Sequence, residues 1–356
     1  MGQKSIVFTG GGTAGHVVVN LALIPEFLQE GYDVHYIGSY NGIEKDLISD
    51  LEGVTYHGIA TGKLRRYISI QNMKDPFLVL KGIFQARLLL KQINPSIVFS
   101  KGGFVSVPVV MASKMVGIPS IIHESDYTPG LANKIATKFS PHILTTFPET
   151  GDHLPKEKVK HMGAIIREEL FEGDPQRAYN FTGLNDKKPI ILIMGGSSGA
   201  QKINESVRLA LPVLLKEYQV IHLCGKGKID ESINQPGYVQ YEYISDELKD
   251  LFSITDVIVS RAGSNSIFEF LALNIPMLLI PLSRQQSRGD QILNAESFKK
   301  QGYAEVIEEE DLTREHLIQK INTLYEKRDH FKQTMSRYQA KEVKSDVVNL
   351  IKNTMK

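Results

Sequence analysis

The chain has 356 residues, a nearly balanced net charge of +1 and one cysteine, Cys224. This length suits two domains of roughly 150 to 200 residues, and the charge balance argues against a nucleic-acid partner. One cysteine excludes an internal disulfide and fits a reducing cytoplasm. No apolar run approaches the roughly 18 residues needed to span a bilayer, and no signal sequence is evident. We therefore expect a cytoplasmic protein whose only membrane contact is at its surface.

Short apolar runs rich in Ile and Val recur along the chain, and stretches with helical spacing separate them. The runs are nearly continuous rather than alternating, which is typical of strands covered on both faces. The runs lie at 5–10, 34–38, 96–100, 120–123, 143–147, 190–196, 220–225, 257–263 and 277–281. Helical spacing follows the first of them at 17–31 and recurs at 266–275. Strand, helix and strand repeated in this way predict parallel α/β sheets.

A sequence pattern that occurs twice divides the chain into two parts. "SIVFTGGGTAGH" opens the first part and "PIILIMGGSSGAQ" opens the second, each a strand that leads into a glycine-rich turn and a helix. The polar, proline-bearing stretch 148–189 is interpreted as the connection between them. We predict two doubly wound, Rossmann-like domains facing each other across a cleft, the first over 1–163 and the second over 164–340. One large sheet with an insertion is the alternative. Ligands of such folds bind beyond the carboxyl ends of the strands.

The first glycine loop has the spacing of a dinucleotide-binding fingerprint, with Gly10, Gly12 and Gly15 in G-x-G-x-x-G. That fingerprint also requires an acid at the end of the second strand, where this chain has Gly38-Ser39. The NAD interpretation therefore lacks its ribose ligand, and tight strand–helix packing is another explanation of the loop. His16 follows directly; its imidazole suits proton transfer near neutral pH, although a structural hydrogen bond is equally open.

The second half contains the stronger candidate site, "VIVSRAGSNSIFEFLAL". It predicts a strand, a turn and a helix that begins near Ser264. Ser264, Asn265 and Ser266 suit an N-cap, where side-chain donors and unpaired amides together favour a diphosphate. Glu269 follows and could accept hydrogen bonds from a ribose diol; a simple interaction with the helix terminus is the alternative.

No Asp-x-Asp and no Cys/His cluster with zinc spacing occurs in the chain. We therefore expect no metal and no other cofactor. A cation such as Arg167 or Arg261 would then balance the diphosphate charge together with helix amides.

Five motifs together identify a family resemblance. "GGGTAGH", "KGGFVSVP", "IHESDYTPGLANK", "MGGSSGAQKIN" and "SRAGSNSIFEFLAL...GDQILNA" resemble, in order and spacing, the MurG family of bacterial peptidoglycan glycosyltransferases over about residues 4–295. The resemblance implies a GT-B fold whose last helix, about 341–356, packs back on the first domain. It implies transfer of N-acetylglucosamine from UDP-N-acetylglucosamine to lipid I, which gives lipid II.

The same resemblance implies a setting and partners. The enzyme would be peripheral at the cytoplasmic side of the cell membrane, in peptidoglycan synthesis and hence in cell shape and division. Other cell-wall synthesis proteins are possible partners.

The resemblance also implies site residues. Glu269 would bind the ribose, Ile244 the uracil through its backbone, and Gln291 the sugar hydroxyls. The full UDP-sugar set is Thr13, Ala14, Gly15, Asp126, Arg167, Ser197, Ile244, Ser264, Asn265, Ser266, Ile267, Phe268, Glu269 and Gln291. His16 would be the general base of an inverting displacement, and His123 and Glu124 are its rivals or an orienting pair.

This chain departs from the family pattern at three places. Ala14 stands at a common glycine, and Ala164-Ile165 replaces a frequent Asn-Pro before Arg167. Asp126 stands where many members have Asn, so its carboxylate would repel a diphosphate unless it turns away or pairs with a cation such as Lys134.

Residues 63–91 combine basic and apolar side chains in a way that suits docking onto an anionic membrane surface. The alternative is a core-packed helix that begins at Asp75-Pro76 and turns Phe77, Leu80 and Phe84 inward. Both can hold at once.

Three other functions remain open. A UDP-sugar 2-epimerase could share the fold and the UDP site, but would not need the basic apolar stretch. An NAD-dependent oxidoreductase and a non-enzymatic membrane scaffold are the others.

Overall fold

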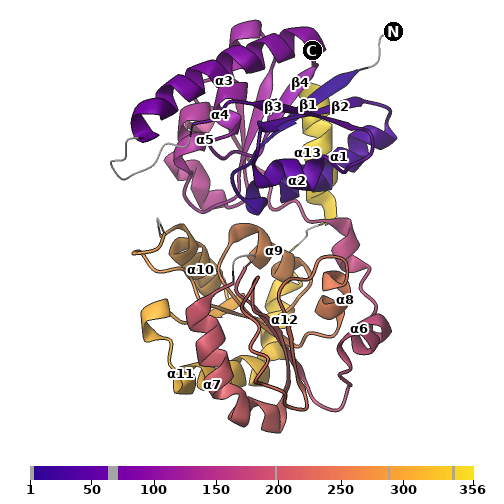
Figure 1. Cartoon of the computed structure of the whole chain (residues 1–356), viewed down its shortest axis with the longest axis vertical. Coiled ribbons are helices and arrows are strands. Elements are labelled where there is room, and N and C mark those ends of the chain that lie inside the picture. Colours follow the sequence, from indigo (N-terminus) through magenta and orange to yellow (C-terminus); the bar gives the residue numbers. More distant parts are fainter. Residues whose placement is uncertain (1–3, 63–70, 197–198, 288, 339–340) are drawn as a thin grey trace. The chain divides into compact units, whose positions relative to one another are not determined.

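The computed structural model describes residues 4–62, 71–196, 199–287, 289–338 and 341–356. The chain divides into two compact units, Met1–Ile165 with Ala340–Lys356, and Ile166–Gln339. Each unit has its own sheet with helices packed on it (Figure 1). Every strand pairing in both sheets is parallel. The prediction of two Rossmann-like α/β domains is therefore confirmed.

The first unit is built on a seven-stranded sheet in the order β3-β2-β1-β4-β5-β6-β7. Its strands are β1 (Ser5–Thr9), β2 (Asp33–Ser39), β3 (Val54–Ile59), β4 (Ile97–Ser100), β5 (Ser120–Glu124), β6 (His142–Thr145) and β7 (Val159–His161). Its helices are η1 (Ala14–His16), α1 (Val18–Gln29), α2 (Ile43–Ile48), α3 (Gln71–Ile93), α4 (Ser106–Val116), α5 (Leu131–Ala136), η2 (Pro148–His153), η3 (Lys156–Lys158) and α13 (Lys341–Thr354).

Successive side chains of β1 enter two different cores. Ile6 and Phe8 pack in a cluster with α1 and α13, whereas Val7 packs with α3 and α4 on the other face. The continuous apolar run of a central strand follows from this, because both faces of the sheet are covered. The last helix contributes Val347 and Ile351 to the first cluster, and Figure 1 shows it, in yellow, against the indigo elements of the first unit.

The second unit has a six-stranded sheet in the order β10-β9-β8-β11-β12-β13. Its strands are β8 (Ile190–Met194), β9 (Gln219–Leu223), β10 (Tyr238–Tyr241), β11 (Val257–Ser260), β12 (Met277–Leu279) and β13 (Ala304–Val306). Its helices are η4 (Glu168–Phe171), α6 (Pro175–Thr182), α7 (Gln201–Glu217), α8 (Leu248–Ser253), α9 (Ser264–Ala272), α10 (Asp290–Lys300), η5 (Glu309–Asp311), α11 (Arg314–Glu326) and α12 (Arg328–Met335).

Four strands were not predicted, and all four lie at sheet edges: β3 and β7 in the first sheet, β10 and β13 in the second. Most of their residues are partly exposed, so they lack the continuous apolar run used as the signal. The stretch 148–189, interpreted as the connection, contains the boundary between the units at Ile165–Ile166 but also folded elements of both. Its first part, through β7, completes the first sheet, and its later part forms η4 and α6 of the second unit.

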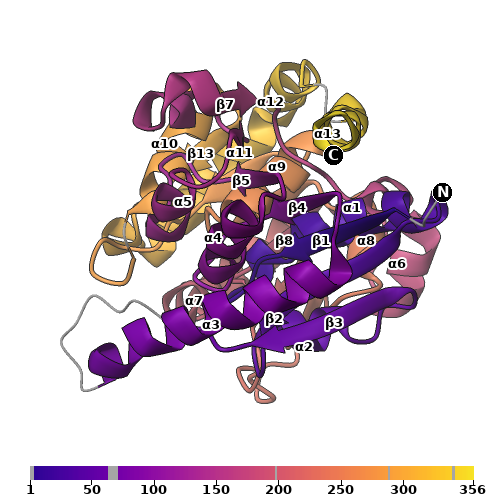
Figure 2. The same ribbon diagram turned by 90° about the horizontal axis from the view of Figure 1, so that it is seen from above.

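Helix α3 differs from the core-packed alternative considered above. It begins at Gln71 rather than at Asp75, and Pro76 lies inside it. Phe77, Leu80 and Phe84 are 74%, 64% and 59% exposed instead of facing inward. The buried positions include Gly82, where a Cβ would clash with the carbonyl oxygen of Ala60. Figure 2 shows α3 alongside α4, with which it packs.

Candidate functional site

The first candidate region lies beyond the carboxyl ends of β1 and β4, adjacent strands of the first sheet. The glycine loops that follow them meet, since Gly11 N donates to Gly102 O at 3.3 Å. A Cβ at Gly103 would clash with the carbonyl oxygen of Gly11 and lie 3.1 Å from Nδ1 of His16. Glycine at 103 therefore lets the second loop approach the segment that carries the predicted base.

His16 ends the short helix η1 and is partly buried. Its Nδ1 lies 2.9 Å from Oγ1 of Thr13. If Nδ1 carries the hydrogen and the hydroxyl accepts it, Nε2 is the basic nitrogen of the imidazole. Thr13 is exposed, and Ala14 and Gly15 are partly buried in the same turn. The predicted donor-sugar contacts and the predicted base are thus consecutive in one tight turn.

A buried carboxylate that sequence reasoning missed holds this loop in place. Glu44, on α2, is fully buried. Its Oε2 accepts from Gly12 N at 3.1 Å, and its Oε1 accepts from Ser39 N at 3.0 Å and from the Ser39 hydroxyl. A Cβ at Gly11 or Gly42 would collide with this carboxylate. The only signal in the sequence was an acid shortly after the second strand.

Glu124 is likewise occupied by the loop that follows β5. Its Oε1 accepts from Asp126 N at 3.0 Å, and its Oε2 accepts from Gly130 N and Asn133 Nδ2, each at 2.9 Å. Burial, reinforced by the charge of Asp126, raises the pKa of Glu124. With three donors on its two oxygens, this carboxylate orders the loop, which argues against Glu124 as the general base.

His123 is also unsuited to act as the base. Its side chain is 1% exposed and stacks on Phe99. Burial, followed by the charge of Lys101, lowers the pKa of His123 well below its ordinary value. A neutral, enclosed imidazole is out of reach of an acceptor hydroxyl. Of the three proposed bases, His16 is the one that is not committed to the core.

Lys101 is a buried cation close enough to Asp126 for their charges to interact. Lys101 is 1% exposed and donates to Oγ of Ser125 at 2.7 Å. Burial lowers the pKa of Lys101, whereas the charges of Glu124 and Asp126 raise it. The carboxylate that replaces the family's Asn therefore has a buried counter-charge from the neighbouring strand.

The second candidate region is the amino end of α9, beyond β11. Gly263 is the N-cap residue, with an extended backbone, so the prediction of a side-chain N-cap was wrong. Ser264 and Asn265 are the first two helical residues and Ser266 the third. Ile267 and Phe268 are buried, and Phe268 stacks edge-on against Phe298. Because their side chains are apolar and buried, Ile267 and Phe268 can contribute only backbone groups to a ligand.

Arg167 and Glu269, predicted to bind different parts of UDP, lie against each other. Oε1 of Glu269 accepts from Nε of Arg167 at 3.3 Å and from NH2 at 3.2 Å. Burial raises the pKa of Glu269, and the arginine opposes that rise. The ion pair thus holds the guanidinium of Arg167 against the carboxylate of Glu269, which is itself on α9.

Arg261 is buried, pairs with Glu309 and donates to the carbonyl oxygens of Ile280 and Pro281, so it is a structural cation and cannot balance a diphosphate.

The side chain of Ile244, in the segment after β10, is buried, whereas its neighbours Tyr243 and Ser245 are exposed. Oε1 of Gln291 accepts from Leu282 N at 3.0 Å. Ser197 lies outside the described residues. No group of three or more potential metal ligands occurs among the residues that the structure describes.

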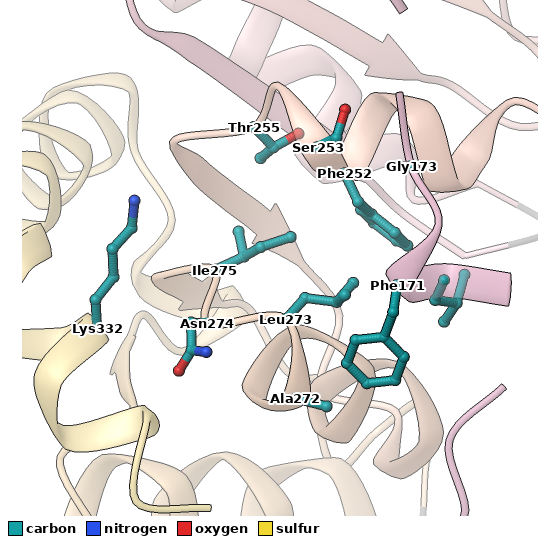
Figure 3. Close-up of a pocket in the computed structure, with 11 residues that line it drawn as sticks. Phe171, Gly173, Phe252, Ser253, Thr255, Ala272, Leu273, Asn274, Ile275 and Lys332 are labelled. Carbon is teal, nitrogen blue, oxygen red and sulfur yellow. The ribbon is translucent and has the colours of Figure 1, made fainter. Parts of the chain in front are cut away.

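A pocket of about 350 Å³ lies elsewhere in the second unit, around the carboxyl end of α9 (Figure 3). Phe171, Phe252, Leu273 and Ile275 contribute apolar surface, and Lys332 lies at its margin. It contains none of the predicted site residues, and it is at the opposite end of α9 from the amides that favour a diphosphate.

Comparison with known proteins identifies the family of both units. Residues 6–145 match the glycosyltransferase family 28 N-terminal domain, and residues 190–351 match the C-terminal domain of that family. A protein of Oceanobacillus iheyensis is 57% identical over 99% of both chains, and one of Geobacillus thermodenitrificans is 53% identical over 99% of both. Both are named UDP-N-acetylglucosamine–N-acetylmuramyl-(pentapeptide) pyrophosphoryl-undecaprenol N-acetylglucosamine transferase.

The crystal structure of Acinetobacter baumannii MurG resembles this chain with a TM-score of 0.76 and 25% identity, over 98% of this chain and 99% of that one. The chain therefore belongs to glycosyltransferase family 28, in the MurG group that includes these transferases.

Proposed function

We propose that this chain is an inverting hexosyltransferase that moves N-acetylglucosamine from UDP-N-acetylglucosamine to the C4 hydroxyl of the muramoyl sugar of lipid I. The observation that carries this is the 53–57% identity, over nearly the full length, with enzymes named for that transfer. Neither the epimerase nor the NAD-dependent alternative has comparable support. The fully buried Glu44 also cannot serve as the ribose ligand that an NAD site requires.

The residues of the first unit suit the acceptor chemistry. In an inverting displacement the acceptor oxygen attacks C1 of the donor sugar, the bond from C1 to the UDP oxygen breaks, and the hydroxyl proton must leave. His16 accepts that proton at Nε2 while Thr13 holds Nδ1, with the 2.9 Å contact as the supporting observation. Orientation of the imidazole by a fixed hydroxyl keeps the basic nitrogen in one tautomer.

The residues of the second unit suit the leaving group. As the bond to UDP breaks, negative charge grows on the diphosphate, and backbone amides in the first turn of α9 stabilise it. The guanidinium of Arg167, which pairs with Glu269 and Glu169, contributes a cation beside the diphosphate, and Glu269 accepts hydrogen bonds from the ribose diol. Gln291 binds the sugar through its amide nitrogen, since its oxygen accepts from Leu282.

The reaction is tested with purified protein, labelled UDP-N-acetylglucosamine and a short-chain lipid I analogue, first without and then with added Mg²⁺. Acceptor-dependent release of UDP with a disaccharide product supports the proposal. Binding of UDP-N-acetylglucosamine without transfer would contradict the acceptor and favour the epimerase. Absence of both would contradict the whole assignment.

We also infer that α3 docks onto an anionic membrane surface at the cytoplasmic side. Phe77, Leu80 and Phe84 are exposed on it, with the cations Lys81 and Lys91 on the same helix. The basic residues 63–70 lie outside the described residues. No described helix is long and apolar enough to cross a bilayer, so this proposal concerns surface contact.

Vesicles of phosphatidylglycerol at low salt should retain the protein, and Phe77→Ser/Phe84→Ser should reduce that retention. Leu209→Ser, at a residue 64% exposed on α7, is the matched control. Equal retention of all three proteins would contradict docking through α3.

A further inference from the structure

A second pocket of the first unit contains an unusual concentration of positive charge. Its volume is about 390 Å³, and Lys114, Lys138, Lys158 and Lys356 line it. The remaining lining residues are apolar or small, and none is acidic. Lys114 and Lys138 are exposed on the surface, and Lys158 is partly buried.

The pocket lies at the amino ends of the strands, whereas the glycine loops lie at their carboxyl ends. It is formed by the carboxyl end of α4, the connection from α5 to β6, and Lys158 at the end of η3. These segments precede β5 at Ser120 and β6 at His142, so they gather at the amino ends of these strands. Of the residues predicted for catalysis, His16 follows β1, and His123 and Glu124 are the last two residues of β5, so they lie at the carboxyl ends of the strands and the pocket is a separate site.

The charges in this pocket have no acidic partners. Among the described residues, none of the four lysines lies within 4.0 Å of a carboxylate in an ion pair. Two amines are instead fixed by neutral acceptors: Nζ of Lys158 donates to Thr137 O at 2.8 Å, and that of Lys356 donates to Gly117 O. Like charges in one concavity repel one another and focus positive potential, which an anion would neutralise.

We propose that this pocket binds a phosphate-bearing anion. Lysine ammonium groups bind phosphate as point charges without demanding one planar geometry. The volume falls within the range of small-molecule sites, so it accommodates an organic group on the phosphate. Ile118 and Phe139 among the lining residues offer apolar contact to such a group. A soluble phosphate ester and the headgroup of an anionic lipid share this chemistry; the lipid case rests on the proposed membrane contact.

The test uses the full chain and the variant Lys114→Gln/Lys138→Gln, whose residues are exposed and lie outside the proposed catalytic machinery. Lys187→Gln/Lys216→Gln, exposed in the second unit, is the control with the same change in charge. Binding of sn-glycerol 3-phosphate is measured by calorimetry at constant ionic strength, and retention on phosphatidylglycerol vesicles by flotation. Loss of two cations should raise the Kd for glycerol 3-phosphate roughly tenfold or more, whereas the control should change it less than twofold.

The two probes distinguish the sources. Weaker binding of both glycerol 3-phosphate and vesicles by the variant identifies a lipid headgroup, and unchanged vesicle retention identifies a soluble ester. No measurable binding of glycerol 3-phosphate to the unmodified chain, or equal binding by all three proteins, overturns the proposal. Transfer to a soluble lipid I analogue should be equal in all three proteins, so failure of this site and failure of the proposed transferase are separable.

Discussion

Replacement of Glu44 by Gln tests whether the buried carboxylate positions the loop that carries His16. The glutamate accepts one hydrogen bond from Gly12 and two from Ser39. Glutamine keeps one oxygen, so its NH2 must face one of these donors and leave it unsatisfied. An unpaired buried donor costs about 1–3 kcal/mol, and the free energy of unfolding should fall by that amount. For a domain of this size, each 1 kcal/mol corresponds to roughly 2–4 °C in Tm.

Turnover should fall further than stability alone would require. If the NH2 group displaces Gly12, the loop shifts and carries Thr13 and His16 with it. A misplacement of about 1 Å can reduce the rate by roughly 10²-fold. We expect kcat to fall about 10- to 10²-fold at a temperature where the variant is fully folded. The KM for UDP-N-acetylglucosamine should change less than kcat, because the contacts proposed for the uridine and the diphosphate lie in the second unit and only the donor-sugar contacts of Thr13, Ala14 and Gly15 lie in this loop.

The assay is steady-state transfer to a soluble lipid I analogue, together with thermal and chemical denaturation. Asp46→Asn is the matched control, since it removes a charge from an exposed position of the same helix and should change stability by less than about 0.5 kcal/mol. Full turnover in Glu44→Gln would refute the positioning role. A raised KM for the donor with unchanged kcat would show that the loop binds the donor rather than orienting the base.

Three further predictions concern single side chains. His16→Ala should lower kcat by roughly 10²-fold or more while the Kd of UDP-N-acetylglucosamine stays the same; full activity would remove His16 as the base. Glu269→Gln should raise that Kd at least about tenfold, because a charged acceptor contributes about 1.5–3 kcal/mol per hydrogen bond, and an unchanged calorimetric Kd would contradict the ribose role. Burial lowers the pKa of His222 from its ordinary 6.5 to about 3. Between pH 6.5 and about 3, therefore, the unfolded chain binds a proton at His222 that the folded chain does not bind. The free energy of unfolding should fall on acidification by about 1.4 kcal/mol per pH unit in this range. Urea titrations of His222→Gln should show a shallower dependence of that free energy on pH.

The central part of each sheet was predictable from the sequence because its strands are covered on both faces. Runs such as 5–10 and 190–196 are nearly continuously apolar, and they became β1 and β8. The edge strands β3, β7, β10 and β13 have one neighbour each and partly exposed residues, so their apolar pattern is interrupted. The amphipathic face of α3 was misassigned for a related reason: the aromatic side chains were assumed to face inward, whereas the buried positions include Gly82, Ala86 and Leu90.

The sequence predicted the glycine loops of the candidate site, but not the buried charged residues Glu44 and Lys101 that hydrogen-bond to the loops of this site. Glu44 is 32 residues from Gly12, and Lys101 is 24 from Ser125, so no local pattern connects them. Strand order connects them: β2 lies beside β1, and β5 lies beside β4. In a doubly wound sheet, residues that follow adjacent strands meet at one edge. Applied to this chain, that rule predicts that an acid soon after the second strand reaches the first glycine loop.

The same geometry explains why G-x-G-x-x-G has a different meaning here from its meaning in a dinucleotide site. In such a site the amides of the loop point to a pyrophosphate. In this chain the amide of Gly12 donates to Glu44, so an internal carboxylate takes the place of an external anion and puts negative charge behind the loop. An approaching phosphate would meet repulsion there. The loop is suited instead to fixing Thr13 and His16, which agrees with the proposal that the amino end of α9 and Arg167 bind the UDP diphosphate.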